Sequence, residues 1–281
     1  MAEARGRPLW LRFRSRRIIL VLEGEVHDAL ARGNADAALG ALGGLAGRYR
    51  WHAPVETLLF RRAARPTDEV TLVALLRGIT AGAGFRRHHR DYAAVSLAYW
   101  AVASGDQDLA RELQAGLERA VAELEADPAT LYCRRRNRES RLKRLISSRA
   151  ALFHLALLLG DQATLAATGP WAHTLLARLD FDRLPADVSL RLMTNFGRSL
   201  ALQAPKEPRL LRADLERLMA EAARPRHRRS RAPEDHLGFL RGLLADLERG
   251  QPPLRILNVD TPTLREGLES FWQAAGLGQG A

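Results

Sequence analysis

The apolar residues of this chain recur three and four positions apart along almost its whole length. Ile19, Leu22, Val26 and Leu30, for example, fall on one face of a helix over residues 18–30. The same spacing predicts further helices over residues 35–48, 67–80, 91–103, 108–124, 137–159, 161–179, 187–204, 209–223, 236–249 and 263–272. Only residues 254–259 have the pattern of an extended segment. We therefore predict an all-α chain with about ten or eleven helices.

Three junctions between predicted helices share one pattern. Each has a helix end rich in Ala and Leu, then a glycine, then Asn or Asp, then a new amphipathic helix; the pairs are Gly33–Asn34, Gly105–Asp106 and Gly160–Asp161. Glycine readily adopts the left-handed conformation that ends a helix, and Asn or Asp can cap the start of the next one. We expect each junction to join a tight antiparallel pair of helices.

These junctions resemble those of the tetratricopeptide repeat, whose paired helices carry small residues and a similar Gly–Asp turn. The resemblance is confined to the junctions, within residues 18–180. The family's period of roughly 34 residues is absent, because 72 residues separate Gly33 from Gly105 and 55 separate Gly105 from Gly160. The resemblance implies a helical-hairpin array of the α-solenoid kind, and an irregular helical bundle is the alternative.

The predicted helix over residues 35–48 carries glycines at four positions of one side. They are Gly40, Gly43, Gly44 and Gly47. Intervals of three and four residues place them on the same side of a helix. A helical glycine costs about 1 kcal/mol relative to alanine. The bare side therefore predicts close approach of another helix.

Basic charge is concentrated in four segments. The chain carries 43 Lys and Arg against 32 Asp and Glu, a net charge of +11. The basic residues cluster in residues 1–17, 85–90, 128–149 and 224–231, so the rest of the chain is mildly acidic. Such clusters attract anionic partners. The excess of arginine over lysine fits bidentate anion binding, and codon bias explains it equally well.

The sequence divides into three parts by composition. We predict a basic N-terminal arm over residues 1–17, a helical-hairpin array over 18–204, and C-terminal helices over 205–281 with an exposed basic loop at 224–233. The apolar run at residues 18–22 is too short for a signal peptide, and no stretch is long and apolar enough for a membrane span. We expect a cytoplasmic chain, with peripheral membrane contact through Trp10 and Phe13 as an alternative.

No motif of catalysis or metal binding stands out. The single cysteine excludes an internal disulfide framework. His88 and His89 are adjacent, so on a helix they point in different directions and cannot share a metal ion. His154 and His173 stand in apolar surroundings typical of core histidines. We assign no catalytic residue, metal or cofactor, and we expect the chain not to be an enzyme.

The strongest candidate site is a set of arginines. They lie before and within the predicted helix 137–159 and in the segment that precedes the helix 91–103: Arg134, Arg135, Arg138, Arg141, Arg86, Arg87 and Arg90. If the two groups face one groove, their guanidinium groups would converge on an anionic ligand. A solvated cluster beyond the end of the core is the alternative.

The sequence therefore favours a non-catalytic scaffold that binds an acidic protein or peptide through its basic clusters. The alternative is a protein that binds nucleic acid or another polyanion. The chain has no recognised nucleic-acid signature, and few aromatic residues for stacking on bases. An all-α enzyme without a recognisable motif is a third, weaker possibility.

Overall fold

The computed structural model describes residues 24–48, 69–82, 84–127, 136–169, 171–184, 208–228, 233–249 and 262–275, with some residues between 186 and 197. All regular structure in these ranges is helical and none is a strand, which confirms the predicted all-α fold with about ten or eleven helices. The extended segment predicted at 254–259 and the basic arm at 1–17, with Trp10 and Phe13, lie outside the described residues.

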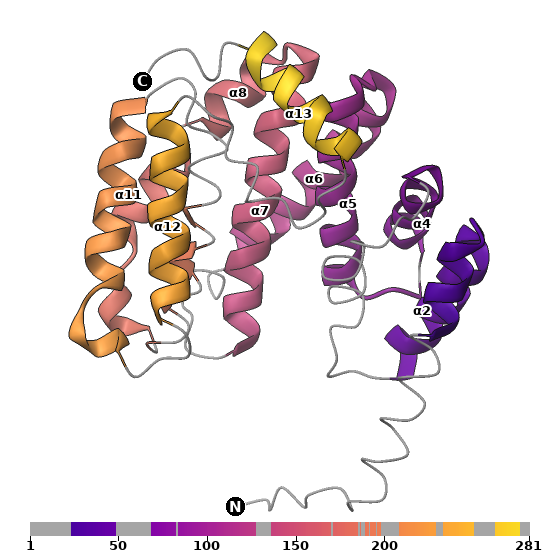
Figure 1. Ribbon diagram of the computed structural model, residues 1–281, viewed down its shortest axis with the longest axis horizontal. Helices are drawn as coiled ribbons and strands as arrows, with labels where there is room; N and C mark the ends of the chain where they lie inside the picture. The colour runs from indigo at the N-terminus through magenta and orange to yellow at the C-terminus, as the bar shows by residue number, and fades with distance from the viewer. Residues whose placement is uncertain are drawn as a thin grey trace, which may run out of the picture. The chain divides into compact units, whose positions relative to one another are not determined.

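The chain forms two compact units that divide within one helix. The first unit, Met1–Ala93, contains a helix at residues 24–31, α2 (Ala35–Arg48), α4 (Glu69–Ala81) and the start of α5 (Arg87–Ser104). The second unit, Ala94–Ala281, contains the rest of α5, α6 (Gln107–Ala126), α7 (Arg136–Leu159), α8 (Gln162–Thr168), α9 (Trp171–Arg178), η2 (Phe181–Arg183), α11 (Pro208–Ala222), η4 (Pro225–His227), α12 (Pro233–Glu248) and α13 (Pro262–Ala274) (Figure 1). The bounds predicted at residues 17 and 204 stay predictions.

The three Gly–Asn and Gly–Asp junctions have the same backbone geometry. The glycines are left-handed, with φ of 68°, 68° and 70° at Gly33, Gly105 and Gly160. The N–H of the next residue donates to a carbonyl of the preceding helix: Asn34 to Ala29 over 2.9 Å, Asp106 to Ala101 over 2.9 Å, and Asp161 to Ala156 over 3.0 Å. Such a bond ends a helix.

The same Asn or Asp side chain then begins the following helix. Its oxygen accepts from the backbone N–H three residues later: Asn34 from Ala37 over 2.9 Å, Asp106 from Leu109 over 2.9 Å, and Asp161 from Thr164 over 3.1 Å. Two adjacent residues therefore end one helix and start the next. The predicted turn chemistry is confirmed at all three junctions.

At two of the four glycines of α2, Gly40 and Gly43, no helix among the described residues makes the predicted close approach. A Cβ added at Gly40 or Gly43 would meet no described atom within 4 Å. The close approach occurs on the opposite helix, where a Cβ at Gly78 of α4 would lie 2.7 Å from Cδ2 of Leu39. The prediction was wrong at Gly40 and Gly43 because α2 packs through Ala38, Leu39 and Leu42 instead.

Alanine at both Gly40 and Gly43 is therefore expected to stabilise the first unit. Neither glycine has a positive φ or a close described neighbour, so alanine gains helix propensity worth about 1 kcal/mol at each position. Urea unfolding of the full chain measures the gain. Gly33→Ala, placed in a left-handed position, is the control and should instead destabilise by about 1 kcal/mol. Loss of stability in the double variant would mean that α2 has a close partner on this side.

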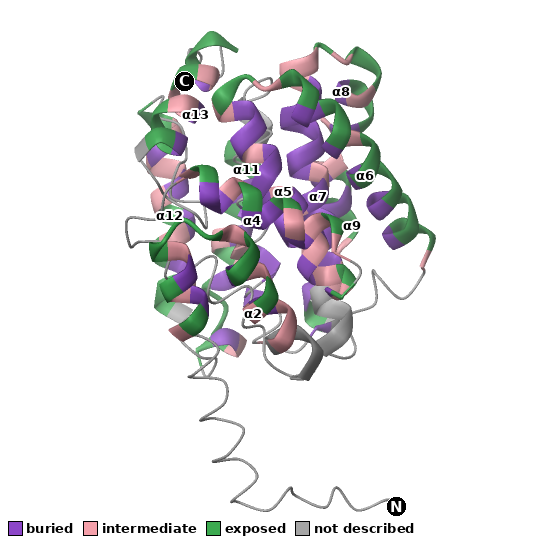
Figure 2. Ribbon diagram, turned by 90° about the vertical axis from the view of Figure 1, so that its right-hand side faces the viewer, coloured by how far each residue is buried: buried purple, intermediate pink, exposed green. Residues whose placement is uncertain are grey.

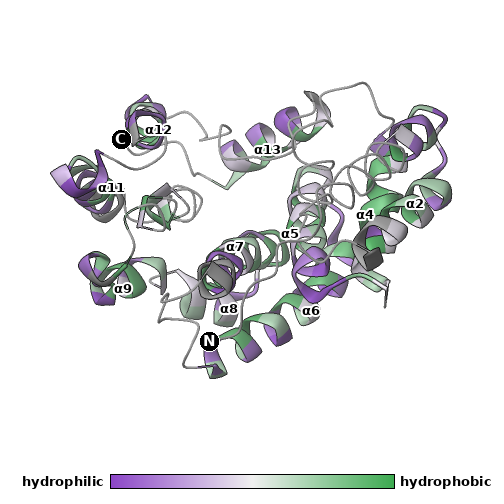
Figure 3. Ribbon diagram, turned by 90° about the horizontal axis from the view of Figure 1, so that it is seen from below, coloured by the Kyte–Doolittle hydropathy of each residue, from purple (hydrophilic) through white to green (hydrophobic). Residues whose placement is uncertain are grey.

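Helix α7 is central to the second unit. Of the apolar stripe that the sequence predicts for this helix, Leu142, Leu145, Ile146, Phe153 and Ala156 are buried and Leu157 is half-buried (Figure 2). Helices α6 and α8 both contact α7, while α9 contacts α8 and α11, and α11 lies beside α12. Seen from below, α13 lies on one side of α5 and α7 and α6 on the other (Figure 3). Side chains of α7 therefore meet neighbours on two faces.

The helix predicted over residues 161–179 is two helices. Helix α8 ends at Thr168, and the N–H of Gly169 donates to the carbonyl of Leu165 over 2.9 Å. Helix α9 then begins at Trp171. The predicted kink is thus a complete break, and it gives α9 a direction of its own.

The segment predicted as an exposed basic loop is anchored over its described part. Pro225–His227 forms the short helix η4, and His227 is fully buried. Arg224 and Arg226 both pair with Asp182, over 2.9 Å and 2.6 Å. The hydrogen bond from Arg226, with that from Arg224, lowers the pKa of the Asp182 carboxyl. The predicted exposure was therefore wrong for Arg226 and His227, whereas Arg224, Pro225 and Arg228 are exposed as predicted; residues 229–232 lie outside the described ranges.

Candidate functional site

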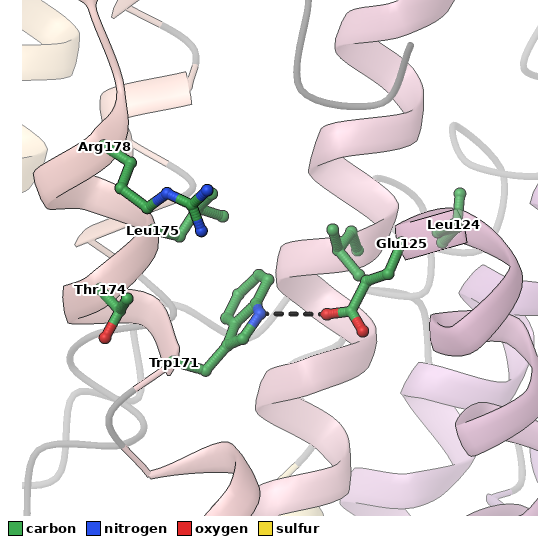
Figure 4. A pocket seen from close by; sticks show the side chains of 7 residues that line it. Leu124, Glu125, Trp171, Thr174, Leu175 and Arg178 are labelled. Carbon is green, nitrogen blue, oxygen red and sulfur yellow. Dashed lines mark hydrogen bonds between the residues drawn. The ribbon is translucent and has the colours of Figure 1, made fainter. Parts of the chain in front are cut away.

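A cavity of about 230 Å³ lies between α6, α7 and α9 in the second unit (Figure 4). Its lining is Leu124 and Glu125 from α6, Leu145 from α7, and Trp171, Thr174, Leu175 and Arg178 from α9. The three leucines are buried and give the cavity an apolar floor. Pockets for drug-sized ligands measure roughly 300–1,000 Å³, so this one suits a single side chain or a small organic group.

One wall of the cavity is held in place by the Glu125 carboxylate, which accepts hydrogen bonds from three nitrogen atoms. Nη2 of Arg149 lies 2.6 Å and 2.8 Å from the two carboxylate oxygens of Glu125, and Nε of Arg149 lies 3.2 Å from Oε1. The indole N–H of Trp171 donates to the same Oε1 over 3.1 Å. The Arg149 guanidinium also lies 5.4 Å from the Trp171 ring centroid, within range of a cation–π contact. Glu125 is thus neutralised, and the indole is held in place.

A second ion pair lies about two helical turns away along α7. Arg141, Leu145 and Arg149 follow one another at intervals of four along α7, and therefore lie on one face of the helix. Arg141 pairs with Asp127, two residues beyond Glu125. The two arginines, each with its own acid, thus bracket the leucine that lines the cavity.

Arg178 differs from the other charged residues of this site. It is exposed on α9, and no hydrogen bond or ion pair joins it to a described residue. Thr174, one turn earlier, also lines the cavity. A guanidinium beside an apolar cavity can receive a carboxylate or phosphate group in a bidentate way. The cavity therefore combines an apolar floor with an available cationic donor.

The predicted arginine site is only partly covered by the structure. Arg141 is engaged by Asp127. Arg86 and Arg90 are half-buried and Arg87 is exposed, all near the start of α5 in the first unit. Arg134, Arg135 and the side chain of Arg138 lie outside what the structure describes. Convergence of the two arginine groups on one ligand stays a prediction.

The residues that form the cavity were not among those predicted from the sequence. Trp171, Thr174, Leu175 and Arg178 follow the spacing of one helical face, so a mixed apolar and basic face could have been noticed. The contact of Trp171 with Glu125 joins residues 46 positions apart. No local pattern predicts that contact.

The histidines separate into two environments. His154 is buried, as predicted, whereas His173 is half-exposed and its Nδ1 lies 2.7 Å from Oδ2 of Asp214. The prediction of a core position was wrong for His173, because the acid that pairs with it comes from α11 and is remote in sequence. No group of three or more His, Cys, Asp or Glu in the described ranges is placed to hold a metal ion.

Comparisons of the chain with protein-family models, curated proteins and solved structures found no match. Among the helices that the structure describes, none has the length and apolar character needed to cross a membrane.

Proposed function

We propose that this chain is a non-catalytic helical-hairpin scaffold that binds an acidic segment of another protein, and that the cavity between α6, α7 and α9 anchors that segment. The observation that carries the proposal is Arg178, a cation that has no ion-pair partner among the described residues and lies beside an apolar cavity whose carboxylate, Glu125, is already paired with Arg149. The repeated helix junctions support a scaffold related to tetratricopeptide arrays, because each one joins two helices through a turn of the same form.

The arrangement suits a specific partner chemistry. A cavity of about 230 Å³ accommodates one large apolar side chain, and Arg178 would pair with a carboxylate next to it. The expected ligand is therefore a peptide in which an aromatic or long aliphatic residue adjoins Asp, Glu or the C-terminal carboxylate. Selection of peptides displayed on phage against the full chain should enrich that pattern.

Arg178→Ala is expected to weaken binding of the selected peptide roughly tenfold or more, because a hydrogen bond to a charged group contributes about 1.5 to 3 kcal/mol. Isothermal titration measures the change. Arg241→Ala is the matched control, since it removes an equal charge from an exposed position on α12. Equal losses in the two variants would contradict a specific role for Arg178.

The polyanion alternative predicts a different response to salt. Affinity for nucleic acid falls steeply as salt rises, whereas an apolar side chain held in a cavity should retain most of its binding. Of the arginines described, Arg141, Arg149, Arg212, Arg224, Arg226 and Arg249 are already paired with acids, which favours the peptide. Nuclease-sensitive capture with a steep salt dependence would support the polyanion instead.

A further inference from the structure

Three nitrogen-bearing side chains share one face at the start of α5, in the first unit. His89 and Arg90 follow Arg86 by three and four positions, the spacing that brings helical side chains together. Ala93, on the same face, is fully buried. Arg87 lies on a different face and is exposed. The first turn of α5 therefore gathers two guanidinium groups and one imidazole at one place.

A compact turn holds the start of α5 in position. The N–H of Phe85 donates to the carbonyl of Gly82 over 3.1 Å, and a Cβ added at Gly82 would lie 2.8 Å from Cδ2 of the buried Phe85 ring. The carbonyl of Arg86 then accepts the first hydrogen bonds of the helix, from the N–H groups of His89 over 2.9 Å and Arg90 over 3.1 Å. The backbone that carries the three side chains is thus fixed by local structure.

The imidazole of His89 is buried without a hydrogen-bond partner. His89 is 2% exposed, and neither of its ring nitrogens is bonded to a described residue. Burial, and then the nearby His88 and Arg86, lower the pKa of His89 from 6.5 to about 4. At neutral pH the ring is therefore uncharged and has one N–H to donate. A buried donor of this kind calls for an acceptor that the described residues do not supply.

Arg90 also lacks a partner. It is half-buried, its Nε is buried without a hydrogen bond, and no ion pair joins it to a described residue. A guanidinium that is partly removed from water normally pairs with an acid. An anion between Arg90 and the imidazole would satisfy both groups.

The electrostatics of the helix start favour such an anion. Arg86, Arg87 and Arg90 lie within five residues, and the first turn of α5 contains no acid. The N-terminus of a helix is the positive end of its dipole, which attracts anions and disfavours these arginines in the absence of one. Charge, dipole and unsatisfied donors therefore point to the same kind of ligand.

We propose that the face formed by Arg86, His89 and Arg90, here called the α5 anion site, binds a phosphate monoester. A dianionic phosphate presents several acceptor oxygens, so it can take paired hydrogen bonds from a guanidinium and one from the imidazole. The site belongs to the first unit and does not depend on the function proposed for the cavity at Arg178.

Binding should be visible at His89 itself. Arg86 and Arg90 have long, flexible side chains, which can turn toward an arriving phosphate and open the way to the ring. A phosphate beside the imidazole favours its protonated form, since an opposite charge nearby raises the pKa of a histidine. Phosphate binding and the protonation of His89 are therefore linked.

The test titrates inorganic phosphate into the full chain labelled with ¹⁵N-histidine, at constant ionic strength with chloride as the replacement. The ring signals of His89 are expected to shift with a Kd of about 1 mM or below, and the pKa of His89 should rise by about one unit or more. A shift that does not saturate by about 20 mM would mean an adventitious ion only, and would overturn the proposal.

Model esters define the ligand class. Phenyl phosphate, a monoester, should compete with inorganic phosphate, whereas dimethyl phosphate, a diester with a single charge, should not. Tighter binding of the diester would overturn the monoester and assign the site to a nucleic-acid backbone. A phosphoserine peptide and a free sugar phosphate carry the same monoester group, and the tighter of the two identifies its source.

Arg90→Ala is expected to weaken phosphate binding roughly tenfold or more. Arg87→Ala is the matched control, since it removes an equal charge from an exposed position on a different face of the same turn, and it should weaken binding about twofold or less. Circular dichroism establishes that each chain is folded. Should Arg90→Ala fail to fold, Arg90→Lys keeps the charge but loses the paired donors, and should also weaken binding. Equal losses at positions 87 and 90 would overturn the proposal.

Discussion

Replacing Trp272 with alanine is expected to destabilise the second unit by about 3 to 5 kcal/mol, the usual cost of truncating a large buried aromatic residue. The indole is 5% exposed, and it packs against Ala150 and Leu243 while stacking on His154. Truncation leaves a cavity that three separate helices line, so no single side chain can fill it. Urea unfolding of the full chain, followed by circular dichroism, measures the loss.

Trp171→Ala provides the comparison within the same chain. Trp171 is half-buried; it donates one hydrogen bond to Glu125 and makes one cation–π contact with Arg149. Its removal should cost about 1 to 2 kcal/mol. Equal losses at the two tryptophans would show that Trp272 does not anchor α13 as described.

Lowering the pH from about 7 to about 5 is expected to weaken the second unit by about 2 kcal/mol through His154 alone. Burial lowers the pKa of His154 from 6.5 to about 4. Between these pH values the unfolded chain binds a proton at this position and the folded chain does not. The stability is therefore fully present above about pH 6.5, declines as the pH falls, and levels off below about pH 4.

Unfolding free energies measured at several pH values test this assignment. His154→Leu should remove about 2 kcal/mol of the difference between pH 7 and pH 5, whatever its effect on stability at neutral pH. His173→Gln, which changes a half-exposed histidine, should leave the contribution of His154 in place. A His154→Leu chain with the full pH dependence of the unmodified protein would contradict the neutral, buried state of His154. His89 in the first unit has a pKa lowered to about 4 by burial, and it should add a contribution of the same sign there.

The parts of the fold that the sequence predicted are those decided by neighbours in the chain. A glycine followed by Asn or Asp needs only a few adjacent backbone groups to form its turn, so Gly33, Gly105 and Gly160 could be interpreted without tertiary information. The apolar stripe of α7 was predicted for the same reason, because helical periodicity is a local property.

The glycines of α2 show where local patterns fail. A row of helical glycines has the same spacing whether it faces solvent or another helix. The position of α4 decides which side of α2 is covered, because the side chain of Leu39 packs against Gly78 of α4. The spacing of the glycines therefore identified a side of α2 without side chains. It could not predict whether another helix lies against that side.

The cavity depended on contacts between distant parts of the chain. Arg178 is brought to it by the break between α8 and α9, and Glu125 meets Trp171 across 46 positions of sequence. Arg141 stood out in the sequence as part of a basic cluster. Its acid at Asp127 lies 14 positions away, beyond the reach of a helical pattern.

The Gly–Asn and Gly–Asp junctions also restrict how such a chain can change its length. At Gly105 and Asp106 the residue that completes the end of one helix is the residue that caps the next, so the turn contains no spare peptide unit. An inserted residue would divide these two tasks between different positions, and both helix ends would lose a partner. Insertions and deletions in evolution should therefore avoid these three turns. Each turn would then keep a fixed angle between the two helices that it joins.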